Sequence, residues 1–325
     1  MIELPQILQF DVSAEVAHIT EWIRTTLART LRRQGVVIGV SGGVDSATTA
    51  ALCARAIGPE RVYALLMPDR ESGAETSRLA RHVVAHLEIS NRTIDITSTL
   101  DSLGVYRDRD EIVRRLDPQA HTESAFKIII GDNDTMLSHF TLVTESGGDE
   151  RRTRLDAADY LGIVAATNYK QRVRKSIEYH YADLLNYAVV GTPNRLEYDQ
   201  GFFVKGGDGA ADFKPIAHLY KSQVYAVADH RGLPADVLNQ KPTTDTYSLD
   251  QSQEEFYFGL PLREMDICLY GLNNALSAGE TAQHAGLPVE QVTLAWRRIE
   301  QKRRSTKYLH LSPLLARGVP EVSHE

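Results

Sequence analysis

Six residues between an apolar run and a helical stretch carry the groups best suited to phosphate chemistry in this chain. They are Ser41-Gly42-Gly43-Val44-Asp45-Ser46, directly after Val36–Val40. A strand that ends in a glycine-rich turn and opens a helix directs unpaired backbone N–H groups to one point, at the positive end of the helix dipole. The pattern therefore predicts an anion site suited to a phosphate group.

The residue types within this turn refine the prediction. The glycines permit positive φ and close approach of the backbone to a ligand. Ser41 and Ser46 add hydroxyl donors, and Asp45 can hold a divalent cation that bridges phosphate oxygens. The turn lacks the Lys of the Walker loop and does not fit G-x-G-x-x-G. It resembles instead the loop of the ATP pyrophosphatases, which cleave ATP to AMP and pyrophosphate. The alternative is an ordinary glycine turn.

A basic segment, Asn168–Arg174, is predicted to open a helix. Lys170 and Arg174 would share one face of this helix, with Arg172 on a neighbouring one. The planar fork of Arg matches phosphate or carboxylate. For this segment alone, a solvated basic helix start is an equally good interpretation.

A second polar segment, Gly191–Glu197, follows the predicted strand Tyr187–Val190. Thr192 can bond a nucleotide base or ribose, and Glu197 can be a second carboxylate on a magnesium ion. Asp45 and Glu197 would then hold the metal against the phosphates, neutralising charge as pyrophosphate leaves.

A third segment, Phe202–Asp212, places Gly and Asp residues after an aromatic pair. This composition predicts a mobile binding loop rather than core. Lys205 within the loop and Lys221 beyond it each offer a positive charge for an anion.

The elements that must position these segments alternate between strand and helix, which predicts an α/β fold with a doubly wound, mainly parallel sheet and flanking helices. The expected strands are Val36–Ser41, Arg61–Met67, Arg92–Ile96 and Tyr187–Gly191, and the expected helices are Ile7–Arg33 (interrupted at Thr25-Thr26), Ala47–Ile57 and Glu75–Leu87. Ligands on such sheets bind beyond the carboxyl ends of the strands, where the turn lies.

The chain is interpreted as a single domain over residues 1–325, with an elaboration at about 103–159. Within that elaboration, Phe126–Ile130 and Phe140–Thr144 predict a β-hairpin, and Ser146–Glu150 an exposed turn. The arginines at 107, 109, 114 and 115 alternate with acidic residues, which predicts a solvated helix face.

The segment 246–325 is predicted to be helical, at Leu262–Ala275, Thr281–Ala285 and Val289–Arg303. The last two superficially suggest a DNA-binding pair. The net charge of −7 argues against nucleic-acid binding. Helix pairs of this kind also serve simply as packing units.

Composition places the chain among ordinary globular proteins, with 42% hydrophobic and 24% charged residues. No run is long enough to cross a bilayer, and no signal-peptide layout is present. Two cysteines, Cys53 and Cys268, are too few for a disulfide framework or a Cys-based zinc site. Cys53 is expected to pack in the core. A reduced, cytoplasmic setting is the expectation.

From Thr167 to Asp245 the chain resembles the NAD synthetases, N-type ATP pyrophosphatases that convert the acid of deamido-NAD to the amide. With the Ser41–Ser46 turn, the matching segments span most of the chain in the family's order: Asn168–Arg174, Gly191–Glu197, Phe202–Asp212, Pro215-Ile216, Lys221–Val224, Lys241–Asp245 and Lys302-Arg303. The resemblance implies an adenine nucleotide α-hydrolase-like fold.

The resemblance also implies roles for residues. The implied ATP and pyrophosphate positions are Gly39, Ser41, Gly42, Gly43, Val44, Asp45, Ser46, Thr192, Lys221 and Thr243. The implied deamido-NAD positions are Arg172, Lys205, Asp212 and Lys302. Asp45 and Glu197 match the metal ligands, and the residues expected to act in catalysis are Asp45, Lys205 and Lys221. The family implies a homodimer with the dinucleotide site at the subunit interface.

The sequence departs from the family at three places. Gln301 stands where the family commonly has His, and Met67–Ser72 replaces a Tyr-containing turn that meets the adenine. The stretch between Ile96 and Asn168 is also about forty residues longer than in compact members. These departures bear on the identity of the acid substrate rather than on the reaction type.

The predicted function is an ATP- and Mg²⁺-dependent ligase that adenylates a carboxylate, deamido-NAD in the first instance, and transfers ammonia to it. We expect no glutaminase domain in this chain, so ammonia comes free or from a separate glutaminase. The alternatives are the same chemistry on another carboxylate and a nucleotide-binding sensor without turnover. RNA modification is disfavoured, because it usually adds cysteines and a basic surface.

Overall fold

The computed structural model describes residues 2–119, 125–130, 140–146, 149–241, 247, 249 and 252–319. The strands are β1 (Val36–Gly39), β2 (Val62–Leu66), β3 (Ser90–Thr93), β4 (Ala125–Ile130), β5 (Phe140–Ser146), β6 (Asp149–Arg154) and β7 (Ala188–Val189). The helices are α1 (Val12–Thr25), α2 (Val44–Ile57), α3 (Ala74–His86), α4 (Thr97–Ser102), α5 (Val105–Leu116), α6 (Ala157–Leu185), α7 (Arg195–Gln200), α8 (Lys221–His230), α9 (Ala235–Asn239), α10 (Leu262–Asn273), α11 (Ala278–Ala285) and α12 (Val289–Thr306).

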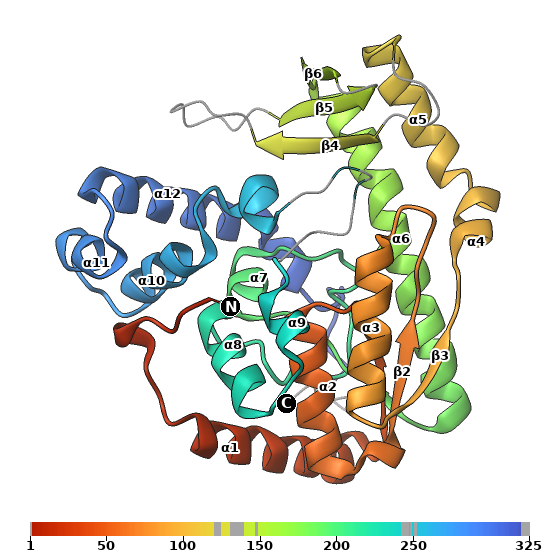
Figure 1. Cartoon of the computed structure of the whole chain (residues 1–325), viewed down its shortest axis with the longest axis vertical. Coiled ribbons are helices and arrows are strands. Elements are labelled where there is room, and N and C mark those ends of the chain that lie inside the picture. Colours follow the sequence, from red (N-terminus) through yellow and green to blue (C-terminus); the bar gives the residue numbers. More distant parts are fainter. Residues whose placement is uncertain are drawn as a thin grey trace.

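The larger sheet is parallel, with the order β3-β2-β1-β7 and helices on both faces. Figure 1 shows two of its strands, β2 and β3, between α3 and α6. Its inner strands are apolar because both faces are covered, and residues alternate between the faces. Val36 and Ile38 pack with α1, α2, α3 and α8, whereas Val37 packs with α4, α5 and α6. The expected doubly wound, mainly parallel fold with a helical C-terminal part is confirmed.

The expected strand at Arg92–Ile96 was misplaced, since β3 occupies Ser90–Thr93. All four residues of β3 are exposed. An exposed edge strand gives no apolar signal in the sequence, and the apolar Ile94 and Ile96 come just after it.

The predicted hairpin is confirmed, with Ile128 opposite Leu142 in the antiparallel pair β4 and β5. A third strand, β6, was not anticipated because it is polar and almost wholly exposed. The expected turn at Ser146–Glu150 lies partly outside the described residues. Figure 1 shows this small sheet at the start of α6, beside α5.

Two predictions about helices were wrong. Asn168 does not open a helix: α6 begins at Ala157, where the Asp156 side chain accepts a hydrogen bond from the Asp159 N–H as an N-cap. Arg109 does not belong to a solvated face, because its side chain is only 2% exposed. Ion pairs from distant segments explain its burial.

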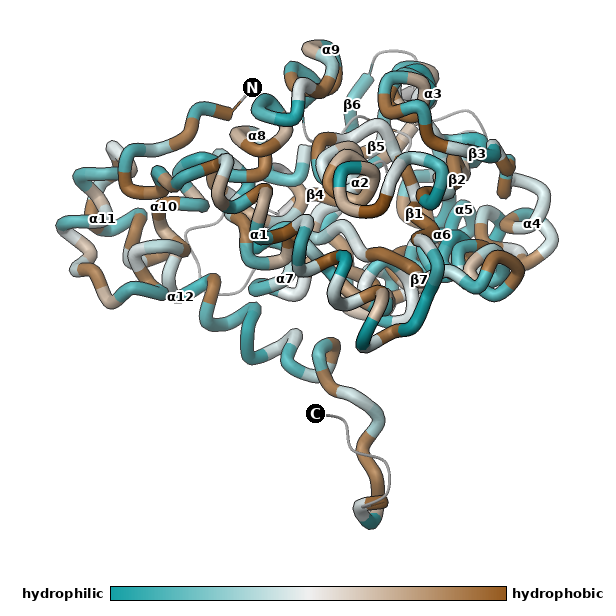
Figure 2. The backbone as a smooth tube through the Cα atoms, turned by 90° about the horizontal axis from the view of Figure 1, so that it is seen from below, coloured by the Kyte–Doolittle hydropathy of each residue, from teal (hydrophilic) through white to brown (hydrophobic). Residues whose placement is uncertain are grey.

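Cys53 lies fully buried in α2, as predicted, and Cys268 is buried in α10. Among the described helices, none combines the length and apolar character needed to cross a membrane. The exposed end of the described chain, after α12, runs out from the body of the molecule, as the tube in Figure 2 shows.

Candidate active site

The turn from Ser41 to Ser46 joins β1 to the start of α2. Gly42 has φ +86°, and a Cβ there would lie 2.6 Å from the Thr76 carbonyl oxygen, so only glycine fits without strain. The Ser46 hydroxyl donates to the Gly43 carbonyl at 3.0 Å and accepts from the Ser41 N–H at 3.3 Å. The serines therefore shape the turn as well as line it.

Asp45 lies in the first turn of α2 and meets side chains from two distant segments. Its carboxylate pairs with Lys221 Nζ, at the start of α8, and accepts a hydrogen bond from Asn194 Nδ2 at 3.2 Å. Lys221 is only 1% exposed. Burial alone would lower the pKa of Lys221, but the charges of Asp45 and Glu197 outweigh it and raise the pKa above its usual value.

Glu197 lies beside this pair, in the first turn of α7. Burial and the nearby Asp45 charge raise the pKa of Glu197 to about 8. Its carboxylate accepts hydrogen bonds from the Asn194 N–H at 3.2 Å and from Gln253 Nε2 at 3.0 Å. Asn194 thus connects the two carboxylates that the sequence predicted would act together.

The donor set fits Mg²⁺ bound together with a nucleotide. Mg²⁺ usually takes one or two protein carboxylates and completes its shell with phosphate oxygens and water. In the described part of the chain, no group of three or more His, Cys, Asp or Glu could by itself hold a metal. The negative charges of Asp45 and Glu197 repel each other, which contributes to the raised pKa of Glu197. A bound cation would offset this repulsion, so the two carboxylates suit Mg²⁺.

One cavity of about 850 Å³ connects the predicted site residues. It runs from the Ser41–Ser46 turn past Thr192 and Lys221 to the basic face of α6 and the end of α12. The predicted residues that line it are Gly39, Ser41, Gly42, Gly43, Val44, Asp45, Ser46, Arg172, Thr192, Glu197, Lys205, Lys221 and Lys302. Thr243 lies outside the described residues.

Asp212 is placed differently from the other predicted residues. It is not among the cavity-lining residues, and its carboxylate accepts hydrogen bonds from the Val189 N–H at 2.7 Å and the Tyr179 hydroxyl at 3.3 Å. These bonds tie the end of the Phe202–Asp212 loop to β7. In this structure Asp212 therefore holds the loop against β7 and does not line the cavity.

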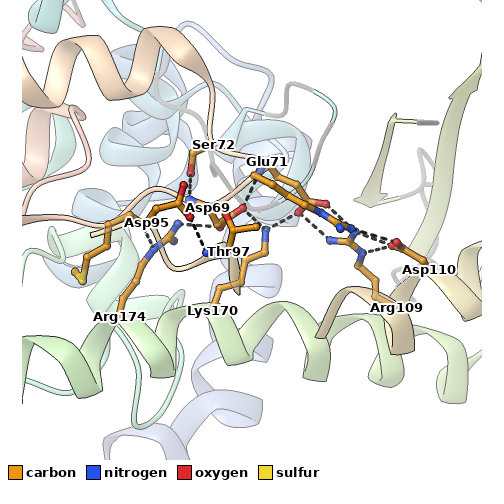
Figure 3. A network of polar contacts seen from close by, with 11 residues as sticks. Asp69, Glu71, Ser72, Asp95, Thr97, Arg109, Asp110, Lys170 and Arg174 are labelled. Carbon is orange, nitrogen blue, oxygen red and sulfur yellow. Dashed lines mark hydrogen bonds and ion pairs between the residues drawn. The ribbon is translucent and has the colours of Figure 1, made fainter. Parts of the chain in front are cut away.

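The α6 residues of the basic segment divide into two groups. Lys170 and Arg174 share one face, as predicted, and form ion pairs with Asp69, so they are not solvated (Figure 3). Arg172 Nε donates to the Lys205 carbonyl at 3.2 Å. Arg172 therefore supports the loop that carries Lys205.

Lys205 contacts the segment after α12, whereas Lys302, within α12, contacts Tyr257. Lys205 Nζ donates to the Tyr308 carbonyl at 2.7 Å and the Leu311 carbonyl at 3.2 Å. Lys302 Nζ donates to the Tyr257 carbonyl and lies 4.0 Å from the centre of that ring. Burial and the Arg298 charge lower the pKa of Lys302 to about 7.

Two residues of the carboxylate cluster were not assigned roles from the sequence. Asn194 caps α7 in a reciprocal box with Glu197, and the N-x-x-E spacing is a signal that could have revealed it. Gln253 reaches Glu197 from a segment 56 positions later, and no local pattern marks it.

A parallel sheet, a glycine-rich turn at a helix start and facing carboxylates define a nucleotide-binding α/β protein. The chain belongs to the NAD synthase family, whose pattern matches residues 15–136 and 151–310. It is 51% identical over 320 residues to the NH(3)-dependent NAD(+) synthetase of Rhizobium meliloti (strain 1021), covering 97% of this chain and 95% of the relative. It is 49% identical to the protein of the same name from Rhizobium rhizogenes, over 96% of this chain and 95% of the relative.

Solved structures support the fold. A structure of NMN synthetase from Francisella tularensis matches with TM-score 0.66 and 22% identity, covering 94% of this chain and 99% of the other. The NH3-dependent NAD synthetase from Campylobacter jejuni matches with TM-score 0.62 and 23% identity, covering 95% and 100%. Identities this low carry the architecture alone.

Proposed function

We propose that the protein is an ammonia-dependent NAD synthetase, which adenylates the carboxylate of deamido-NAD with ATP and replaces AMP by ammonia. Family membership and 51% identity to a relative of that name, over nearly the whole chain, support the reaction. The observation that carries the proposal is the pair of carboxylates, Asp45 and Glu197, beside Lys221 at the Ser41–Ser46 turn.

The chemistry needs activation of a poor electrophile. A carboxylate repels nucleophiles by its own charge, and hydroxide is a very poor leaving group. The carboxylate oxygen attacks the α-phosphorus of ATP. The bond between the α-phosphorus and the oxygen that bridges to the β-phosphate breaks, which gives an acyl adenylate and pyrophosphate. Ammonia then attacks the acyl carbon, the bond to AMP breaks, and a proton is lost to leave the amide.

In this proposal the protein acts by positioning and by neutralising charge. The Ser41–Ser46 turn receives the phosphates, and Lys221 balances charge on the departing pyrophosphate. Asp45 and Glu197 would hold Mg²⁺, which, when bound, offsets the charge that builds up on the phosphates. Lys205, Arg172 and Lys302 would contact the dinucleotide; Thr192 would contact ATP.

Several parts of the proposal concern the setting of the enzyme. Ammonia serves directly or comes from a separate glutaminase, and the protein works in the cytoplasm as a homodimer. Sedimentation analysis tests the dimer: a mass near twice 36.2 kDa is expected, whereas a single 36.2 kDa species contradicts it.

The decisive experiment incubates purified protein with ATP, Mg²⁺, ammonium and deamido-NAD and measures NAD and AMP by chromatography. Equal amounts of NAD and AMP are expected. Release of AMP and pyrophosphate only with another carboxylate would show the same reaction on a different acid substrate. If no acid triggers ATP cleavage, the protein is better explained as a nucleotide sensor.

Substitution of the carboxylates tests the metal assignment. Asp45→Ala and Glu197→Ala are each expected to lower kcat/KM by at least about 100-fold, since each removes a ligand of the ion that stabilises the transition state. Glu60→Ala, an exposed carboxylate after α2, is the matched control. Unchanged Mg²⁺ dependence in both site variants would contradict the assignment.

A further inference from the structure

Five charged side chains form a network of alternating sign (Figure 3), and two of them, Lys170 and Arg174, line the cavity. Asp69 and Glu71 belong to the loop after β2, Arg109 to α5, and Lys170 and Arg174 to α6. Their side-chain exposures are 1%, 9%, 2%, 2% and 14%. Charged groups this deeply buried are costly unless each one is paired, so their pairing is the feature to explain.

Asp69 fixes the loop from one side. Its carboxylate pairs with Lys170 Nζ at 3.3 Å and with Arg174 at 3.1 Å, and it also accepts the Glu71 N–H at 2.9 Å. Arg174 Nε donates in addition to the Met67 carbonyl at 3.1 Å. The end of β2 and the loop after it are thereby bound to α6.

Glu71 fixes the same loop from the other side. Arg109 holds its carboxylate with both terminal nitrogens, at 2.7 and 2.8 Å, and Lys170 Nζ lies 2.5 Å from it. Arg109 also pairs with Asp110 at 2.7 Å, and its guanidinium lies 4.7 Å from the centre of the Phe126 ring. The planar fork is thus held on several sides, which Lys could not reproduce.

The cluster meets the cavity at one side only. Met67, Pro68, Ser72, Lys170 and Arg174 line the cavity, whereas Arg109 and the two loop carboxylates are not among the lining residues. Arg109 is therefore connected to the cavity wall through Glu71, which also pairs with the lining residue Lys170.

The wall that the cluster supports suits a nucleotide base. Leu65, Leu66 and Met67 line the cavity, and the Val40 N–H, next to the Ser41–Ser46 turn, donates to the Leu65 carbonyl at 2.9 Å. Apolar lining with a few fixed polar groups is what a planar heterocycle requires. A wall held in place before binding spares the ligand the cost of ordering it.

We infer that Arg109 is a positioning residue for the nucleotide: through Glu71 and Lys170 it holds the loop after β2 as a preformed wall for the base of ATP. The inference rests on the proposed function for its nucleotide. A residue outside the cavity, on a helix face predicted to be solvated, thereby affects nucleotide affinity and base selection.

The test compares Arg109→Met with Arg107→Met in the full-length protein. Arg107 is a matched control on the same helix, exposed and paired with its neighbour Asp108. For Arg109→Met we expect KM for ATP to rise about tenfold while kcat and KM for ammonium change less than about twofold. The preference for ATP over GTP, as a ratio of kcat/KM, is expected to fall. Arg107→Met is expected to match the wild type.

A double-mutant cycle separates positioning from mere stability. If Arg109 acts through Glu71, then Glu71→Gln, Arg109→Met and the double variant raise KM for ATP by similar, non-additive factors. A lower Tm with unchanged KM and unchanged base preference would overturn the inference. If Arg109→Met does not fold, Arg109→Lys and Glu71→Gln are compared in the same way.

Equilibrium binding keeps the test independent of turnover. Calorimetry with a non-hydrolysable ATP analogue is expected to give a Kd about tenfold weaker for Arg109→Met than for Arg107→Met. Equal Kd values would overturn the inference. Wild-type protein that binds the analogue but forms no NAD would count against the proposed function alone.

Discussion

At the scale of single residues, Lys302 combines an unfavourable environment with a position at the cavity. Its ammonium group contacts the Tyr257 ring and carbonyl, and within the described residues no carboxylate pairs with it. Burial disfavours the charged form, which lowers the pKa to about 7. A poorly solvated amine of this kind is unfavourable for stability and available for a ligand's negative charge.

Replacement of Lys302 by Met is expected to stabilise the ligand-free protein at pH 7 and to weaken substrate binding. Between pH 7 and pH 10.5 the unfolded chain binds more protons at this position than the folded chain, so wild-type stability rises with pH over that window. The variant lacks this slope. At pH 7 it should be more stable by at least about 1 kcal/mol, the worth of one pKa unit.

Denaturant unfolding at pH 7 and pH 10 measures the effect on stability. KM for deamido-NAD measures the effect on substrate binding. The stability difference between variant and wild type should shrink toward pH 10, and KM should rise. A constant difference across this range would show that the Lys302 amine does not titrate there.

Gly42 is the turn residue that tolerates least change. Gly42→Ala is expected to cost about 1–2 kcal/mol for positive φ, with more from the contact with the backbone of α3. Gly43→Ala is the matched control, because its Cβ would meet only the Ser41 hydroxyl, at 3.4 Å. Thermal unfolding measures the loss of stability, and KM for ATP measures the effect on nucleotide binding by the turn. Equal effects of the two substitutions would contradict this account.

At the scale of elements, the segment from Lys307 to Leu311, directly after α12, holds the Phe202–Asp212 loop. The carbonyls of Tyr308 and Leu311 accept hydrogen bonds from Lys205, and the His310 ring packs edge-on against Phe203, with 5.1 Å between ring centres. The loop that the sequence predicted to be mobile is therefore held at both ends, by this segment and by Asp212 on β7.

A chain ending at Thr306 is expected to bind deamido-NAD more weakly, because Lys205 loses both carbonyl partners. KM for the acid should rise about tenfold, with KM for ATP within about twofold. Most of the removed residues are exposed, so little stability should be lost. A chain ending at Pro313 keeps the carbonyls and serves as control. Steady-state kinetics measure both KM values. Equal rises in the two KM values would contradict a selective effect on deamido-NAD and would indicate general disorder of the cavity.

At the scale of the whole molecule, one buried carboxylate joins the C-terminal helices to the sheet domain. Asp266 of α10 accepts hydrogen bonds from the N–H groups of Lys221 and Ser222, at 3.0 and 2.7 Å, and so caps α8. Burial raises its pKa to about 7. The position of Lys221 beside Asp45 thus depends on the docking of a segment 45 residues later.

Asp266→Ala is expected to destabilise the protein by about 2–4 kcal/mol, since two buried N–H groups lose their acceptor. Activity should fall as well, because the start of α8 carries Lys221. Urea unfolding and kcat measure these effects, and Asp229→Ala, an exposed aspartate of α8, is the control. Full activity together with a loss of stability would separate the helix cap from catalysis.

The sequence predicted more of the fold where its signals were local. The β1–turn–α2 unit was placed correctly, because glycine conformations, strand burial and the start of a helix act within a few residues. The start of α6 was missed because its N-cap, Asp156, follows a polar strand, so no change from apolar to polar residues marks the boundary. The edge strand β3 was shifted for the same reason.

By itself, the sequence determined the glycine-rich turn Ser41–Ser46, the order of the polar segments and the family. Only the tertiary structure decided that Lys221 and Asn194 meet Asp45, that Gln253 reaches Glu197, and that Arg109 is buried on Glu71. The reason is physical. Backbone preferences act over neighbouring residues, whereas the partners of a charged side chain depend on which buried faces pack together, across 149 and 176 positions in the case of Asp45.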